Sequence, residues 1–304
     1  MAAQAAEALP LAFDEYEAQP RPRWGRRMWR LARRNPVGAF AAAIVAVFLF
    51  LGVFGPYLAP SDPREIDTSQ QLEAPSWEHP FGTNKLGQDV LSRILAGARI
   101  SFLIGLMSVG IGFSSGAALG IISGYFGRWV DYLIQRSGEA WAAFPQIILY
   151  LAFIAAFGQG LKTIAIAITV GALFGGSRVL RAVALVTRHQ DYVQAARALG
   201  ATEFRILLRH VVPNVMPLVI VGASSVFAVS VLAEAAISFL GLGVAPGTPS
   251  WGIDISGESQ ALARSGNWWL VAFPGIAISL VVLGFNLLGD TLRDILDPRL
   301  RGSR

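Results

Sequence analysis

The chain has 304 residues, of which 54% are hydrophobic and 15% are charged, against roughly 25% charged residues in an average soluble domain. Its mean hydropathy is +0.51. These few ionisable side chains are not enough to cover the water-exposed surface of a soluble protein of this size, so the composition indicates a membrane protein. The chain has no cysteine, which excludes disulfides, thiolate nucleophiles and cysteine-ligated zinc or iron–sulfur sites.

Long uncharged stretches predict where the chain crosses the membrane, because a hydrocarbon core of about 30 Å needs around 20 apolar residues in a helix. Four such stretches each hold one span. A further span begins at Lys162 and either continues past Arg178 or lets both side chains reach the headgroups, since only 15 uncharged residues separate them. The segment from Arg209 to Glu234 supplies the sixth, which predicts an all-α integral membrane fold with six transmembrane helices. The four uncharged stretches are residues 35–61, 100–127, 140–161 and 265–289.

The positions of the basic residues predict the orientation of the chain. Positive residues beside a span mark the cytoplasmic side, and seven arginines precede the first span. With six spans, 18 of the 25 basic residues face the cytoplasm and six lie outside or at the outer boundary, with Arg178 left within a span. We therefore expect both termini in the cytoplasm and the body of the chain in contact with lipid. Topology accounts for the basic excess, so no nucleic-acid partner is expected.

This topology divides the chain into five segments. The outer segment is expected to end in an amphipathic helix from Gln88 that lies at the membrane interface before the chain enters the bilayer. The core is expected to carry a cytoplasmic loop at 187–213. The segments are a basic cytoplasmic tail (1–36), the first transmembrane helix (37–59), an extracytoplasmic segment (60–98), a five-helix core (99–290) and a cytoplasmic C-terminal tail (291–304).

The cytoplasmic loop of the core is polar yet helical in pattern. Asp191, followed three residues later by Gln194, has the form of a capping box and predicts the start of a short helix. That helix is expected to end at Gly200, a residue suited to a helix C-terminus. Thr202 is expected to cap a second helix, which ends before Pro213 because proline lacks the N–H that a continuing helix needs.

The residues of this loop allow two interpretations. Ala195 and Ala196 give a narrow face that a partner can approach closely, with Tyr192 and Leu199 as apolar anchors, so the loop can be a docking peg. Alternatively, the loop is an amphipathic linker on the inner leaflet, where its arginines, Arg205 among them, meet lipid phosphates.

Four stretches of the chain resemble the membrane subunits of ABC-type importers of the dipeptide, oligopeptide and nickel branch. The run DYVQAARALGATEFRILLRHVVPN, which begins at Asp191, is similar to the Glu-Ala-Ala loop of these subunits. Gln194 stands where that motif usually has Glu, while Asn84 and Gln88 stand where Asp and Arg are common. The other three stretches are Phe81–Arg93, Glu234–Gly243 with Pro249–Gly252, and Phe285–Arg301.

The resemblance implies the type I importer permease fold, a multi-pass location in a prokaryotic inner membrane, and a place in a larger machine. Such importers combine two six-span membrane subunits, two cytoplasmic ATPases and an extracytoplasmic solute-binding protein. The chain is then expected to form half of the passage for peptides or similar solutes, to bind no cofactor itself, and to leave ATP and Mg to the ATPases. The resemblance favours a loop that docks into an ATPase. The coupling residues it implies are Asp191, Tyr192, Gln194, Ala195, Ala196, Leu199, Gly200, Arg205 and Pro213.

Two charged residues within spans are candidates for the translocation path. Glu234 is the ionisable residue most clearly inside an apolar stretch, where a charge is costly and commonly functional. The alternative for Glu234 is a structural hydrogen bond to a neighbouring span or contact with water. Arg178 either lines a cytoplasmic vestibule or anchors its span.

The sequence argues against enzymatic chemistry in this chain. Neither Lys85 nor Lys162 follows the glycine pattern of a P-loop. The three histidines, His79, His189 and His210, show neither metal-ligand spacing nor a triad arrangement, so no metal site is expected. The alternative function is a secondary transporter or channel subunit that works without ATPases. It predicts inverted repeats and several polar residues near the midplane, neither of which is apparent.

Overall fold

The computed structural model describes residue 33 and residues 35–245 and 247–296. Over these residues the named elements are all helical, and the one β pairing is an isolated bridge between Thr83 and Asp89. The expected tails at 1–36 and 291–304 fall in large part outside the described residues. The longer helices are α2 (Pro36–Leu58), α3 (Val90–Met107), α4 (Ser114–Phe126), α5 (Arg128–Ala142), α6 (Gln146–Phe157), α7 (Leu161–Thr187), α10 (Val212–Phe239) and α13 (Trp269–Leu296).

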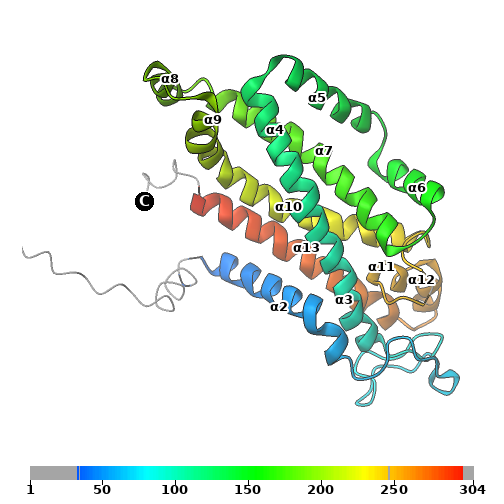
Figure 1. The fold of residues 1–304 in the computed structure, drawn as a ribbon. Coiled ribbons are helices and arrows are strands. Elements are labelled where there is room, and N and C mark those ends of the chain that lie inside the picture. Colours follow the sequence, from blue (N-terminus) through cyan, green and yellow to red (C-terminus); the bar gives the residue numbers. More distant parts are fainter. Residues whose placement is uncertain (1–32, 34, 246, 297–304) are drawn as a thin grey trace, which may run out of the picture.

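Short helices and π-helical segments connect these elements. Two of them, α8 (Asp191–Ala198) and α9 (Glu203–Ile206), occupy the loop between α7 and α10, and two others lie between α10 and α13 (Figure 1). The remaining short segments are η1 (Thr68–Gln70), η2 (Ser108–Phe113), η3 (Leu207–Val211), α11 (Trp251–Asp254) and α12 (Gly257–Arg264).

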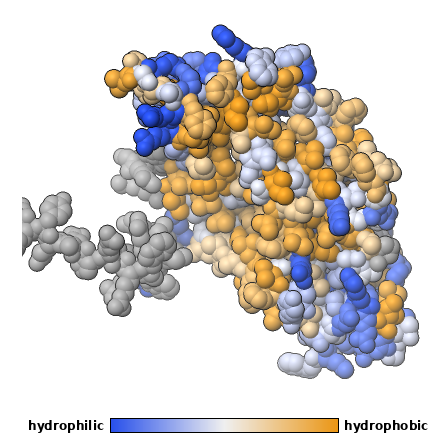
Figure 2. All heavy atoms as spheres, in the orientation of Figure 1, coloured by the Kyte–Doolittle hydropathy of each residue, from blue (hydrophilic) through white to orange (hydrophobic). Residues whose placement is uncertain are grey.

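Five continuous helical stretches are long and apolar enough to cross a membrane, and the bent pair α5 and α6 makes a sixth if it is taken as one span. Figure 2 shows apolar side chains in a broad band across the bundle and polar side chains toward its two ends. An all-helical membrane fold of five to six spans agrees with the prediction. The five stretches are Pro36–Leu58, Val90–Phe126, Leu161–Thr187, Glu203–Phe239 and Trp269–Leu296.

The third predicted span, at 140–161, is not a straight helix. α5 and α6 meet at an angle of 85° across a short break. Pro145 is the N-cap residue of α6, and a proline disfavours the helical conformation at the residue before it, here Phe144. The break therefore follows from local sterics.

The helix predicted from Gln88 forms the first part of a longer helix, and its location at the membrane interface stays a prediction. Its residues form the beginning of α3, which continues through η2 into α4 as one helical stretch of 37 residues. Val90 and Ile94, which belong to the predicted apolar stripe, are buried in the bundle core. The stripe is therefore covered by other helices of the bundle, and α3 begins about 10 residues before the uncharged stretch at 100–127.

Aromatic side chains join α2, α10 and α13. Phe48 contacts Phe227 and Phe285 with ring centroids 5.9 and 6.0 Å apart, in edge-to-face geometry. Phe227 and Phe285 stack on each other at 4.1 Å. All three rings are buried, and aromatic contacts of this kind add stabilisation beyond the area they bury.

Glycines allow η2 and α4 to pack directly on the backbone of α7. Gly112, Gly116, Gly120 and Gly124 recur every four residues and therefore share one helical face. A Cβ atom at each position would lie 2.1 to 2.4 Å from a backbone carbonyl oxygen of α7, which is too close for non-bonded atoms. Close helix contacts in membranes commonly use small residues in this way. The four facing carbonyls belong to Thr169, Leu173, Ser177 and Arg181.

Candidate functional site

Helix α8 lies at the end of the bundle that also holds the start of α2 and the end of α13 (Figure 1). Val193 is fully buried, in an apolar cluster with residues of α4, α7 and α10, and Ala196 packs against the same cluster. In contrast, Tyr192 is 42% exposed and Leu199 is 88% exposed, and Ala195 is also exposed. The short helix is therefore anchored through one face and presents apolar and small side chains on another.

The predicted capping box at the start of α8 does not form. The N-cap residue is Gln190, which makes no side-chain cap hydrogen bond, and Asp191 is the first residue of the helix. The side-chain oxygen of Gln194 accepts a hydrogen bond from Arg197 Nη1 at 3.4 Å instead of reaching back to the cap. Asp191 still places a negative charge in the first turn, where the helix dipole favours it.

The end of α8 matches the predicted glycine turn. Gly200 has a φ of +79°, and its N–H donates to the carbonyl oxygen of Arg197 at 3.0 Å, while the next N–H donates to that of Ala196 at 3.1 Å. This pair of bonds is a Schellman motif, which glycine accommodates without strain. Thr202 then caps α9, as predicted, by accepting a hydrogen bond from the backbone N–H of Arg205 at 3.4 Å.

Pro213 does not end the second helix, contrary to the prediction. α9 continues through η3 into α10, and the helical stretch runs unbroken from Glu203 to Phe239. In the π-helical segment, the N–H of Val212 donates to the carbonyl oxygen of Leu207, five residues back. The wider turn shifts the hydrogen-bond register ahead of Pro213, which lies in the first turn of α10 and needs no intrahelical N–H there.

A carboxylate links α8 to α9 and α4. Glu203, in α9, accepts hydrogen bonds from Arg197 Nε at 2.9 Å and from Arg197 Nη2 at 3.2 Å. The hydroxyl of Tyr125, in α4, donates to the same carboxylate. Sequence patterns did not point to Glu203 or Tyr125, because the two residues lie 78 positions apart and only the fold brings them together.

Glu234, a predicted path residue, is fully buried within the bundle. Its carboxylate accepts hydrogen bonds from Ser238 and Ser250, both at 2.8 Å, and from Ser101 at 3.2 Å. These partners come from α10, from the residue before α11 and from α3. The carboxylate thus joins three parts of the chain, and the cavities described below are lined by other residues.

Two adjoining cavities lie along α7. The larger has a volume of about 380 Å³ between α6, α7 and α10, and it is mostly apolar, with Gln146 and Tyr150 among its polar lining. The smaller, of about 280 Å³, lies between α5 and α7 and is lined by Trp141 and Arg178. Gln146 and Gly171 line both cavities. Of the two predicted path residues, the structure brings Arg178 to a cavity wall.

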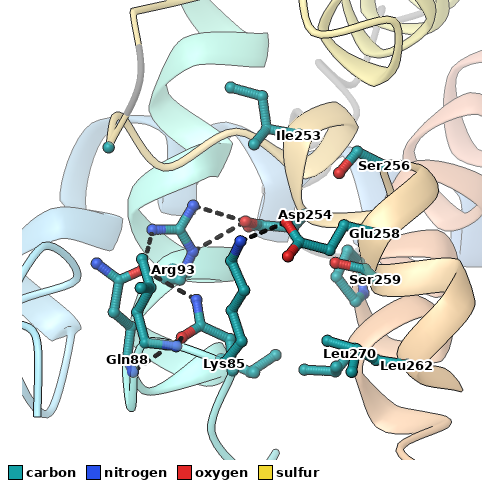
Figure 3. A pocket seen from close by; sticks show the side chains of 15 residues that line it. Lys85, Gln88, Arg93, Ile253, Asp254, Ser256, Glu258, Ser259, Leu262 and Leu270 are labelled. Atoms are coloured by element: carbon teal, nitrogen blue, oxygen red, sulfur yellow. Dashed lines mark hydrogen bonds and ion pairs between the residues drawn. The ribbon is translucent and has the colours of Figure 1, made fainter. Parts of the chain in front are cut away.

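A polar pocket of about 140 Å³ lies at the opposite end of the bundle from α8 (Figures 1 and 3). Arg93, in α3, donates to Asp254 Oδ1, in α11, from Nε at 2.9 Å and from Nη2 at 2.6 Å. Gln88 accepts a further hydrogen bond from Arg93 at 2.9 Å, and Lys85 pairs with Glu258 across the pocket. Burial raises the pKa of Asp254, and the charge of Arg93 opposes this effect.

Residues 116–302 match the family of binding-protein-dependent transport system inner membrane components. This match covers more than half of the chain. The chain belongs to this family. Residues 23–75 also match the N-terminal transmembrane domain of oligopeptide transport permease C.

Two similar proteins carry transport permease names. A dipeptide transport system permease protein of Alkalihalophilus pseudofirmus is 38% identical over 278 residues, which cover 91% of this chain and 90% of the relative. A glutathione transport system permease protein of Escherichia coli O6:K15:H31 is 36% identical over 299 residues, which cover 98% of this chain and 97% of the relative.

Family membership confirms several predictions. The chain is a membrane permease subunit of an ABC-type importer, has the type I permease fold and is a multi-pass protein of the inner membrane, not an enzyme. The coupling role of the α8 loop, the path roles of Glu234 and Arg178, and the cytoplasmic location of both termini stay predictions.

Proposed function

We propose that this permease subunit imports peptides or similar small solutes by coupling an ATPase at α8 to a passage along α7. The observation that carries this proposal is the exposed apolar surface of α8, formed by Tyr192 and Leu199 on a helix anchored by the buried Val193. Dipeptide and glutathione transport are named for the relatives, so small peptides are the proposed substrate class.

The end of the bundle that holds α8 is proposed to face the cytoplasm. The seven arginines that precede the first span lead into the start of α2, which lies at this end. Basic residues beside a span favour the cytoplasmic side. Arg197, Arg205 and Arg209 lie in or just after the α8–α9 loop, so the same end is basic on two separate segments.

The α8 surface fits a groove on a cytoplasmic ATPase subunit. Short helices commonly dock by laying apolar side chains into a groove, and here Tyr192 and Leu199 would be the anchors while Ala195 permits close approach. ATP and Mg are proposed to bind the ATPase subunits, since this chain carries no P-loop. Closure of the ATPases would then displace α8.

The cavity between α6, α7 and α10 is proposed as one wall of the passage. It is open, apolar and lies in the membrane-spanning part of the chain, and a second, homologous permease subunit would complete it. An extracytoplasmic solute-binding protein is proposed to deliver substrate at the end that holds α11 and α12. Lipid surrounds the remaining apolar surface, including the exposed side of α2.

Transport by the reconstituted complex tests this function. The permease, its paired permease, the ATPases and the binding protein would be incorporated into vesicles, with a labelled dipeptide and glutathione offered in parallel. We expect uptake that requires both ATP and the binding protein. Uptake down a solute concentration gradient into vesicles that lack the ATPases would contradict the proposal and favour a secondary transporter or channel.

A further inference from the structure

Glu203 occupies the junction between the proposed ATPase-docking helix and the membrane-spanning bundle. Its carboxylate is held from one side by two hydrogen bonds from Arg197, in α8, and from the other by the hydroxyl of Tyr125, near the end of α4. The Arg197 and Glu203 side chains are 43% and 51% exposed. An exposed ion pair contributes little to stability, so the arrangement calls for a role other than holding the fold together.

The apolar contact of α8 with the bundle does not fix its direction. Val193 enters the cluster formed by α4, α7 and α10, and Ala196 packs against it one turn later. Burial of aliphatic side chains is favourable without a preferred orientation. A guanidinium that donates two hydrogen bonds to one carboxylate has a defined geometry. The contacts of Glu203 therefore set the angle of α8 relative to α4, while Val193 sets its depth.

α4 cannot move independently of α7 at this end of the bundle. Gly116, Gly120 and Gly124 seat α4 on the backbone of α7 over successive turns, and packed interiors resist continuous deformation. α7 in turn lines both cavities, with Gly171 in each wall. A continuous chain of contacts thus leads from α8 through Glu203 and Tyr125 to the cavity wall.

We propose that Glu203 is a positioning residue that locks α8 to the α4–α7 pair, so that displacement of α8 moves this pair and with it the wall of the passage. The proposal rests on the proposed function, in which an ATPase displaces α8. Without the lock, α8 would tilt on Val193 when the ATPase closes, and ATP hydrolysis would proceed with little transport.

The ratio of solute transported to ATP hydrolysed in the reconstituted complex tests the lock. Glu203→Gln removes the charge while an amide oxygen remains for Tyr125. We expect this variant to assemble with the ATPases. Its ratio of solute transported to ATP hydrolysed should fall about fivefold or more, in line with typical coupling between sites. The exchanged pair Arg197→Glu with Glu203→Arg should recover much of the ratio, which a general loss of stability would not allow. Glu139→Gln is the matched control, because it breaks an exposed ion pair within α5.

Spin labels provide a second readout, and the absence of native cysteines makes them straightforward to place. Labels at Ala198→Cys, in α8, and Ile122→Cys, in α4, should give a narrow distance distribution that broadens in Glu203→Gln. An unchanged distribution together with an unchanged transport ratio would overturn the proposal. If Leu199→Arg leaves ATPase assembly intact, the proposed function fails and the lock fails with it. If Leu199→Arg abolishes assembly but Glu203→Gln keeps the normal transport ratio, the lock alone fails.

Discussion

Substitution of Gly116 by alanine is expected to force α4 away from α7. The new Cβ atom would lie 2.1 Å from the carbonyl oxygen of Leu173 and 2.8 Å from its carbonyl carbon. Since carbon and oxygen in close contact stay about 3.3 Å apart, the helices must separate by roughly 1 Å. Overpacking of this kind costs about 1–3 kcal/mol, from which about 0.5–1 kcal/mol is offset by the better helix propensity of alanine. A net destabilisation of about 0.5–2 kcal/mol follows from these magnitudes.

Gly110→Ala is the matched control, because a Cβ at Gly110 meets no atom within 4 Å. This variant should be neutral or more stable by up to about 1 kcal/mol. Both variants would be unfolded in mixed micelles with increasing SDS, with tryptophan fluorescence as the signal. Equal unfolding midpoints for Gly116→Ala and Gly110→Ala would refute the packing of α4 on the α7 backbone.

Three further predictions concern side chains that tie elements together. Val193→Ala should weaken the attachment of α8 to the bundle by about 2 kcal/mol, because it removes buried apolar surface. Amide exchange over residues 191–199 should then accelerate about tenfold or more, and unaltered exchange would rule out Val193 as the anchor. Glu234→Ala should destabilise the chain by about 2–4 kcal/mol because three serine hydroxyls lose their acceptor. Glu234→Gln should transport normally, and a transport loss in a stable Glu234→Gln variant would instead identify Glu234 as a path residue. Asp254→Ala should destabilise by about 3 kcal/mol because it leaves the buried Arg93 without its countercharge, and an unfolding midpoint equal to that of the unsubstituted chain would contradict the ion pair's structural role.

Span positions could be predicted from the sequence because the membrane imposes a length and an apolar composition on each helix. The charge of Arg178 did not mislead this reasoning, since α7 runs past it from Leu161 to Thr187. The third span departs most from the prediction. Its break depends on backbone sterics at Pro145 and on the amphipathic character of α5, which charge-free lengths do not report.

In the α8 loop, local signals predicted the end of α8 and the cap of α9, but not the hydrogen bonds at the start of α8 or the end of the second helix. Gly200 ends α8 because a left-handed residue is needed there, which a single residue type reveals. The predicted capping box at Asp191 and the predicted helix end at Pro213 were both wrong, because the backbone N–H groups at these positions form other hydrogen bonds. In particular, the π-helical turn before Pro213 is a choice of hydrogen-bond register that residue identities alone do not specify.

Contacts between distant segments could not be read from the sequence. Arg93 and Asp254 lie 161 positions apart, and Ser101 lies 133 positions from Glu234. Neither pair has a local pattern that marks it. The role of Glu234 as a link between elements could be stated beforehand only as an alternative to a path role, and the structure supplies the three partners that favour the link.

Co-purification of the ATPases with a Leu199→Arg permease tests the central claim most directly. Leu199 is 88% exposed, so the substitution disturbs little of the packing among the described residues. Changes at Gly200 or Ala196 would instead strain the turn or the buried cluster. Ser137→Arg, at an exposed position of α5, controls for the added charge. The account predicts that Leu199→Arg lowers ATPase recovery about tenfold or more while Ser137→Arg recovers normal amounts. Equal recovery with both variants would contradict the assignment of α8 as the ATPase contact.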